Sequence, residues 1–125
     1  MTGNPCMGMT YAELIVKKNH DDGNQIEVRF LIDSGAVYSL IPKADLEKLG
    51  IQPHRRMKFV LADGAEIERR VGDAYFEWRG EGGAAPVIFG EKGDKPLLGA
   101  TTLESLGLVL NPFSRELHPM RMMLA

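Results

Sequence analysis

The residues with the clearest capacity for chemistry are Asp33, Ser34 and Gly35, which place a carboxylate, a hydroxyl and a glycine in succession. The apolar run 30–32 precedes them, so we expect Asp33 to lie in or near the core, where an unpaired charge is costly. The hydroxyl of Ser34, with a second one from Ser39, could reduce that cost. Taken alone, the tripeptide favours an ordinary turn, because Asp, Ser and Gly dominate turns.

The elements that must position this loop are strands. Residues 11–17 are rich in β-forming types, and residues 25–32 alternate between apolar and polar side chains. The Asp, Asn and Gly of residues 20–24 lie between the two runs, which predicts a β-hairpin. The second strand of that hairpin leads directly into Asp33.

The rest of the chain predicts further short strands and one or two short helices. A helix is expected over 42–49, which begins with proline and is followed by Gly50. A second is expected over 101–106, where Thr101 and Glu104 have capping-box spacing. The other predicted elements are strands at 58–61, 66–78, 86–89, 97–98, 108–110 and 116–118, with loops at 54–56, 80–85 and 91–95. Many short strands with frequent turns predict an all-β fold, a barrel or a sandwich.

Two segments echo one another weakly. Residues 46–51 read Leu-Glu-Lys-Leu-Gly-Ile, and residues 103–108 read Leu-Glu-Ser-Leu-Gly-Leu. Each copy follows an apolar strand that ends in a glycine loop, at 31–35 and at 97–99. Such short sequences recur by chance, but the shared strand–loop–helix context favours a degenerate duplication.

In its wider context, the segment 30–41 resembles the active-site signature of retropepsin-like aspartic proteases, in which apolar residues lead into Asp-Thr/Ser-Gly-Ala. A second mark of that family, two apolar residues and a glycine before a short helix, is matched by Leu97, Leu98 and Gly99. The resemblance extends from residue 26 to about residue 112. It is nearest to the prokaryotic single-domain branch, whose Leu-Ala-Asp-Gly motif is found at 61–64.

The resemblance implies a closed β barrel with a flap hairpin over the active site. It implies Asp33 as the catalytic residue, with Ser34, Gly35 and Ala36 shaping the active-site loop, and Leu97, Leu98 and Gly99 as a second glycine loop. The flap tip, which would contact substrate, corresponds to Ala62, Asp63, Gly64 and Ala65. In the family, the hydroxyl at the position of Ser34 braces the loop across a two-fold axis.

The implied chemistry is hydrolysis of peptide bonds by a pair of carboxylates. Two carboxylates roughly 3 Å apart cannot both ionise cheaply, so they share one proton. The ionised member removes a proton from water, and the neutral member hydrogen-bonds to the scissile carbonyl. The sequence contains a single Asp-Ser/Thr-Gly. One chain therefore supplies one carboxylate, and a homodimer is expected to supply the second.

Composition supports a single domain over residues 10–125, preceded by a flexible leader at 1–9. The net charge of −2 gives no reason to expect a nucleic-acid partner. The three histidines are scattered and do not have metal-ligand spacing, so we expect neither a metal nor another cofactor. No apolar run approaches the length of a membrane helix. The single cysteine, Cys6, fits a reducing cytoplasm.

A second interpretation belongs to a different functional class: a retropepsin-like fold retained as a dimerisation or peptide-binding module with little or no proteolysis. Both interpretations predict the same dimer. The presence of Asp33 favours the enzyme, because a binding module has little use for a carboxylate in that loop. The sequence does not specify the substrate, the cleavage preference, the working pH or the biological pathway.

Overall fold

The structure is a computed structural model that describes residues 9–121 and residue 124. Cys6 and nearly all of the predicted leader lie outside those residues. The described elements are β1 (Tyr11–Lys17), β2 (Gln25–Ile32), β3 (Ser39–Pro42), α1 (Lys43–Lys48), β4 (Arg55–Val60), β5 (Glu66–Trp78), β6 (Glu81–Gly90), β7 (Leu97–Leu98), α2 (Ala100–Ser105), β8 (Leu108–Leu110) and β9 (Leu117–Pro119). The expected all-β fold with two short helices is confirmed.

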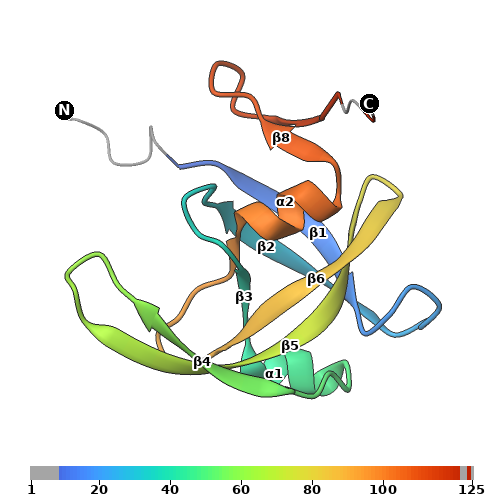
Figure 1. The fold of residues 1–125 in the computed structure, drawn as a ribbon. Coiled ribbons are helices and arrows are strands. Elements are labelled where there is room, and N and C mark those ends of the chain that lie inside the picture. Colours follow the sequence, from blue (N-terminus) through green and yellow to red (C-terminus); the bar gives the residue numbers. More distant parts are fainter. Residues whose placement is uncertain (1–8, 122–123, 125) are drawn as a thin grey trace.

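Seven strands form one sheet in the order β1-β2-β7-β3-β6-β5-β4. β5 also pairs with β1, from Ile15 opposite Glu77 to Lys17 opposite Tyr75, so the sheet closes into a ring with β4 at its margin (Figure 1). β8 and β9 form a separate antiparallel pair. The ring brings β2 beside β7 in parallel, and this pairing places the two glycine loops together.

The core lies inside the ring. On β2, Val28, Phe30 and Ile32 are buried while Glu27 and Arg29 are exposed, which confirms the alternation read from the sequence. Phe30 packs against Phe76 of β5 with ring centroids 6.1 Å apart. Burial of such aromatic side chains contributes roughly 1.5–3 kcal/mol each relative to exposure. The strand that leads to Asp33 is therefore held firmly from inside the sheet.

Both expected hairpins are present. β1 and β2 pair antiparallel from Tyr11 opposite Leu31 to Lys17 opposite Gln25. β4 and β5 pair from Arg55 opposite Val71 to Val60 opposite Glu66. The second strand pair begins earlier than expected, because the 13-residue β5 is long enough to offer partners to residues 55–57. The prediction of a loop at 54–56 was therefore wrong for Arg55 and Arg56, although both remain exposed.

The prediction of a loop at 80–85 was also wrong, because residues 81–85 belong to β6. They pair with β5, where Gly82 lies opposite Glu77 and Gly83 opposite Phe76. A side chain at Gly83 would begin 2.8 Å from the carbonyl oxygen of Ser105, and one at Gly82 would overlap the ring of Tyr75. In these positions glycine allows another segment to approach the strand closely. Glycine serves this purpose in strands as well as allowing turns.

The capping box expected at Thr101 and Glu104 is not formed. α2 begins one residue earlier, at Ala100, and its N-cap is Gly99 without a side-chain hydrogen bond. Thr101 is therefore inside the helix. Its N–H is bonded instead to the carbonyl oxygen of Val37 at 2.9 Å. Contact with another segment, and not a local cap, satisfies this end of the helix.

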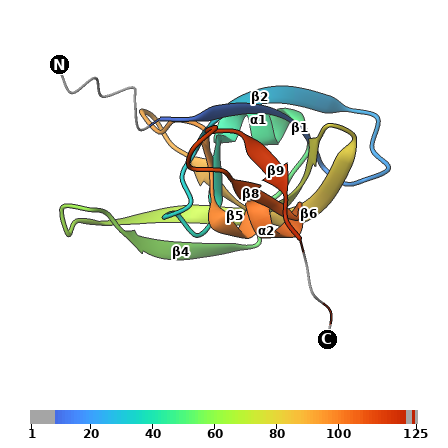
Figure 2. The ribbon, with the colours of Figure 1, turned by 90° about the horizontal axis from the view of Figure 1, so that it is seen from above.

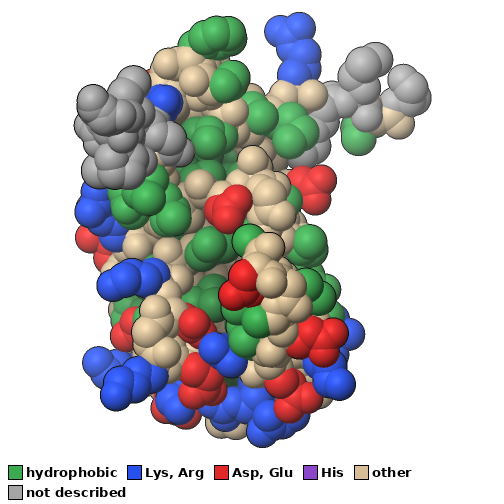
Figure 3. Space-filling model, turned by 90° about the vertical axis from the view of Figure 1, so that its left-hand side faces the viewer, with side chains coloured by type: hydrophobic (Ala, Val, Ile, Leu, Met, Phe, Trp, Pro, Cys, Tyr) green, Lys and Arg blue, Asp and Glu red, His purple; other side chains and the backbone are tan. Residues whose placement is uncertain are grey.

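The β4–β5 hairpin projects from the ring as a long two-stranded arm (Figure 2). In Figure 1 its tip extends to the left, the side on which the loop between β2 and β3 also lies. Figure 3 shows this side face on. Hydrophobic and uncharged surface dominates its middle and upper part, whereas Lys, Arg, Asp and Glu crowd its lower end. Within the described residues, no helix is both long and apolar enough to cross a membrane.

Candidate active site

Asp33 is the first residue after β2, at the point where the chain leaves the sheet. The N–H of Gly35 donates to Oδ1 of Asp33 at 3.0 Å, and the N–H of Ala36 donates to the carbonyl oxygen of Asp33 at 3.1 Å. The carboxylate is thus held by its own loop, with Oδ2 left for other partners. Ser34 occupies the turn beside it, and its side chain is exposed.

The expectation that Asp33 lies in or near the core was wrong for the single chain. Ile32 is 8% exposed, whereas Asp33, Ser34 and Gly35 are all exposed. The apolar residues on either side belong to β2 and β3, which turn inward, while the loop between them remains at the surface. In the single chain the Asp33 carboxylate is therefore open to solvent.

The second glycine loop lies directly behind the Asp33 loop. The N–H of Asp33 donates to the carbonyl oxygen of Leu98 at 2.9 Å, and the N–H of Ala100 donates to that of Ala36 at 2.8 Å. The backbone of Tyr38 approaches Gly99 so closely that a Cβ there would lie 2.6 Å from the Tyr38 carbonyl carbon and oxygen. The two loops therefore form one hydrogen-bonded unit.

A cavity of about 420 Å³ opens between this unit and the β4–β5 hairpin. One wall consists of residues 35–38, with Leu40 and Leu97 behind them. The opposite wall consists of residues 58–61 together with Ile67 and Arg69. A lining that is mainly apolar, beside an exposed carboxylate, suits the side chain of a bound peptide.

The predicted flap tip is an exposed turn at the end of the β4–β5 hairpin. Residues 62–65 are all exposed, and Leu61 and Ala65 close the turn by an N–H to carbonyl hydrogen bond of 2.8 Å. Oδ1 of Asp63 accepts the N–H of Ala65 at 2.9 Å. The hairpin shares the cavity with the Asp33 loop, so the structure places the predicted flap and the predicted catalytic loop on one side of the molecule.

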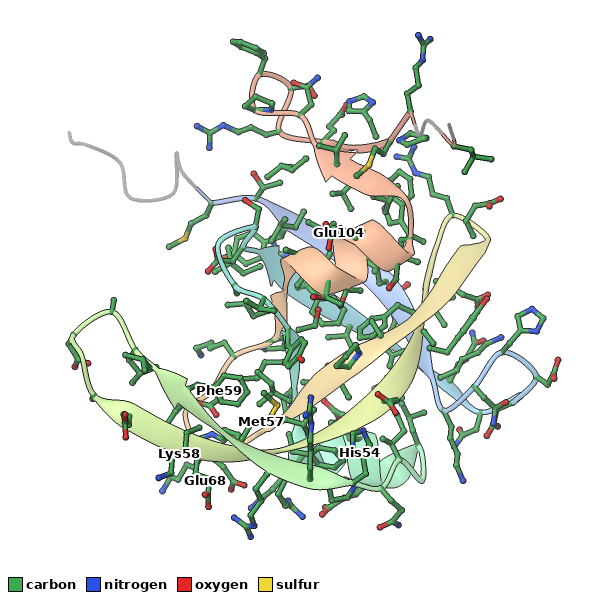
Figure 4. The ribbon with its side chains drawn as sticks, viewed as in Figure 1. His54, Met57, Lys58, Phe59, Glu68 and Glu104 are labelled. Carbon is green, nitrogen blue, oxygen red and sulfur yellow. The ribbon has the colours of Figure 1, made fainter. Side chains whose placement is uncertain are left out.

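Sequence reasoning did not identify the side chains that line the inner face of this hairpin. In Figure 4, Met57 and Phe59 extend toward the body, whereas Lys58 and Glu68 extend from the outer face. The ring of Phe59 meets that of Tyr38 edge to face at 6.5 Å, which joins the hairpin to the Asp33 loop. The alternation of residues 57–60 could have identified this inner face.

From the sequence we expected the hydroxyl of Ser39 to lie near the Asp33 side chain, and this expectation was wrong. Ser39 is fully buried in β3, and its hydroxyl contacts Gly99 and Thr102 instead. Successive residues of a strand face opposite sides. In β3, Ser39 and Ile41 are buried while Leu40 and Pro42 are only partly buried, so the side chain of Ser39 faces the interior.

A charged cluster connects the base of the hairpin to the loop before β7. Nε of Arg69 donates to Oδ2 of Asp94 at 2.9 Å, and the same oxygen accepts the N–H of Glu91. Glu91 also accepts a hydrogen bond from Lys43 at 2.8 Å, which holds the pKa of its carboxyl below the ordinary value. Burial raises the pKa of Asp94, but the Arg69 side chain and the Glu91 N–H outweigh it, and the net pKa is lowered.

The substitution Asp94→Asn should lower the free energy of unfolding at neutral pH by roughly 1–3 kcal/mol, because it removes a charged partner of Arg69. A lowered folded-state pKa stabilises the fold above the unfolded-state pKa, and this stabilisation is lost as pH falls through the folded-state value. The gap between the parent and the variant should therefore shrink in acid. Denaturant unfolding across pH measures it, with the exposed Glu13→Gln as control. If the difference in unfolding free energy between the parent and Asp94→Asn did not change with pH, the lowered pKa of Asp94 would be contradicted.

No group of three or more His, Cys, Asp or Glu side chains within the described part of the chain could hold a metal ion. Asp33 precedes the cavity-lining residues 35–38 by two positions and is not itself part of the lining. Asp63, the other acidic residue that the sequence singled out, is in the turn of the hairpin and bonds its own backbone.

Comparison with known proteins agrees with this geometry. Residues 20–78 match a family model described as aspartyl protease, a range that includes the Asp33 loop and the β4–β5 hairpin but not Gly99. The protease of EIAV complexed with the inhibitor HBY-793 is 16% identical, with 93% of each chain covered and a TM-score of 0.57. The solution structure of simian foamy virus (mac) protease is 22% identical, with 74% of this chain and 92% of that chain covered and a TM-score of 0.49. No curated protein matches significantly.

The family match over residues 20–78 and the retroviral-protease fold of the chain together support a retropepsin-like aspartic protease. The resemblance read from residues 30–41 is thereby confirmed. Its assignment to the prokaryotic single-domain branch stays a prediction.

Proposed function

We propose that this protein is an aspartic endopeptidase that acts as a homodimer, with one Asp33 from each chain. The observation that carries the proposal is the exposed Asp33 loop, rigidly backed by Leu98 and open to a cavity beneath a hairpin. Its single carboxylate per chain is half of what the chemistry requires. Asp33 is the proposed catalytic residue, and residues 62–65 are the proposed flap tip.

The proposed reaction begins with a water molecule between the two Asp33 carboxylates. The ionised carboxylate removes a proton from the water, and the water oxygen bonds to the scissile carbonyl carbon. The neutral carboxyl donates its proton to the carbonyl oxygen and stabilises the developing charge. The tetrahedral intermediate then collapses, the C–N bond breaks, and the amide nitrogen leaves with a proton returned by the pair.

The surface around Asp33 is suited to a partner of the same kind. Val37 beside the catalytic loop is 64% exposed, and Phe113 in the β8–β9 turn is 95% exposed. Their segments reach the side of the molecule seen in Figure 3, where charged groups are sparse over the middle and upper part. Interfaces within homodimers are more apolar than ordinary surface. A two-fold axis on this side would bring both Asp33 loops together.

The proposed setting is a reducing cytoplasm, in keeping with the single cysteine, and the proposed substrates are peptides or unfolded protein segments. An apolar cavity beneath a hairpin suits an extended peptide whose apolar side chains point alternately into it. No cofactor is required by the proposed reaction.

Sedimentation velocity at micromolar concentration tests the assembly, and we expect a species of twice the chain mass. Cleavage of a mixed peptide library from acidic to neutral pH tests the activity, and we expect new termini between apolar residues. A strict monomer up to crystallisation concentrations would refute the dimeric mechanism. A dimer that cleaves no member of the library would favour a peptide-binding or dimerisation module.

A further inference from the structure

Ser39 and Thr102 are the two polar side chains that the described part of the chain buries completely, each at 0% exposure. They come from β3 and α2, which are 63 residues apart in the sequence. Burial of a hydroxyl is costly unless it is hydrogen-bonded. A pair of valines or alanines would pack the same space, so the presence of two hydroxyls requires a reason.

The hydroxyls form a closed network with one backbone group. Oγ of Ser39 lies 2.5 Å from Oγ1 of Thr102 and accepts the N–H of Gly99 at 2.9 Å. Three segments thus meet at one oxygen: β3, the second glycine loop and α2. Gly99 is also in direct contact with the backbone of Tyr38, so the loop has little freedom to move toward β3.

The backbone of Leu98 connects this network to the proposed catalytic residue, Asp33. Leu98, next to Gly99, accepts the N–H of Asp33, and Ala100, on the other side of Gly99, donates to Ala36. The residues flanking Gly99 therefore bond both ends of the catalytic loop. Whatever fixes Gly99 also fixes the position of the Asp33 carboxylate.

We infer that Ser39 and Thr102 are positioning residues for Asp33, an inference that rests on the proposed protease function. Their hydroxyls hold Gly99, and Gly99 holds the Asp33 loop through its two neighbours. Neither hydroxyl touches substrate or water, since both are fully buried. The network keeps the two carboxylates of the dimer at the separation that sharing a proton requires, because small displacements of a reacting group carry large kinetic penalties.

Ser39 is the more important of the two hydroxyls. Its oxygen is the acceptor for Gly99, so Ser39→Ala leaves a buried N–H without a partner. Thr102→Val keeps the shape of the side chain and removes only the hydroxyl, and the bond between Gly99 and Ser39 survives. Thr102→Ser keeps the hydroxyl and removes only a methyl group, and it is the matched rescue variant.

The test compares these three variants with Val16→Ala, a truncation in β1 at the end of the hairpin remote from Asp33. Peptide cleavage gives kcat and KM, thermal unfolding gives stability, and amide hydrogen exchange reports on the N–H groups of Asp33 and Gly99. We expect Ser39→Ala to lower kcat by roughly 10²-fold with KM within about threefold, and Thr102→Val to lower it less. Thr102→Ser should retain the parental kcat.

Exchange at Asp33 and Gly99 should be at least about tenfold faster in Ser39→Ala, and unchanged in Val16→Ala at equal distance below its melting temperature. If Ser39→Ala keeps its kcat, or if Val16→Ala loses as much, the hydroxyls serve only stability and the inference is overturned. If the parent cleaves no peptide, the proposed function fails. Unaltered exchange at Asp33 in Ser39→Ala would then overturn the positioning role independently.

Discussion

Asp33→Asn should reduce peptide cleavage by at least about 10³-fold while leaving the fold and the dimer intact. The amide oxygen can still accept the N–H of Gly35, which now bonds to Oδ1 at 3.0 Å, so the loop geometry survives. The substitution removes the group that takes a proton from water. Because it also removes repulsion between two carboxylates at the axis, the dimer should be as stable as the parent or slightly more so.

The measurement is cleavage of a defined peptide by the parent and the variant across acidic to neutral pH, with thermal unfolding of both. The parent should cleave the peptide at some pH in this range, and the variant should be at least about 10³-fold slower at every pH. Asp21→Asn, at an exposed aspartate in the β1–β2 turn, is the control and should cleave normally. A parental rate from Asp33→Asn would show that Asp33 is not catalytic.

Gly99→Ala should damage both stability and activity, because no space exists for the added methyl group. Its Cβ would lie 2.6 Å from the carbonyl carbon and oxygen of Tyr38 and 3.0 Å from the carbonyl oxygen of Ala36. These are backbone atoms of the Asp33 loop, so relief of the clash must move that loop. We expect a loss of about 1–3 kcal/mol in the free energy of unfolding and a fall in kcat of roughly 10²-fold.

Gly23→Ala is the matched control, since a Cβ at Gly23 meets nothing within 4 Å and the backbone there tolerates a side chain. It should change stability by less than about 0.5 kcal/mol. Denaturant unfolding and steady-state kinetics of both variants give the comparison. Equal behaviour of Gly99→Ala and Gly23→Ala would mean that the contact between the two glycine loops does not constrain the site.

The parts of the site that follow from local patterns could be predicted from the sequence. The alternation around Phe30 specified β2, and the end of that strand specified the place of Asp33. The Asp63–Gly64 pair specified the hairpin turn, which the structure shows between β4 and β5. In each case the signal lies within a few residues of the feature, so no knowledge of the fold was needed.

The features that were missed depend on contacts between distant segments. The hydrogen bond between Arg69 and Asp94 and the contact of Tyr38 with Phe59 leave no trace in the sequence around either partner. Gly83 was taken for a loop residue because glycine serves both turns and close approaches, and only the position of Ser105 distinguishes the two uses. The exposure of Asp33 likewise depends on where the sheet ends.

The same limit applies to α2. Thr101 and Glu104 have the spacing of a capping box, but the N–H of Thr101 is already bonded to Val37 across the loop interface. Tertiary contact decided the start of the helix against the local signal. Substitutions that test the site should therefore address contacts between segments, as at Gly99.

The most direct test of the central claim, that each active site needs an Asp33 from both chains, is a titration of parent protein with Asp33→Asn protein. Total concentration is held constant and the chains are allowed to exchange. If both carboxylates are required, only dimers of two parental chains are active, and an equal mixture should retain about one quarter of the parental activity. If each chain carried a complete site, the mixture would retain about one half, which would contradict a shared active site.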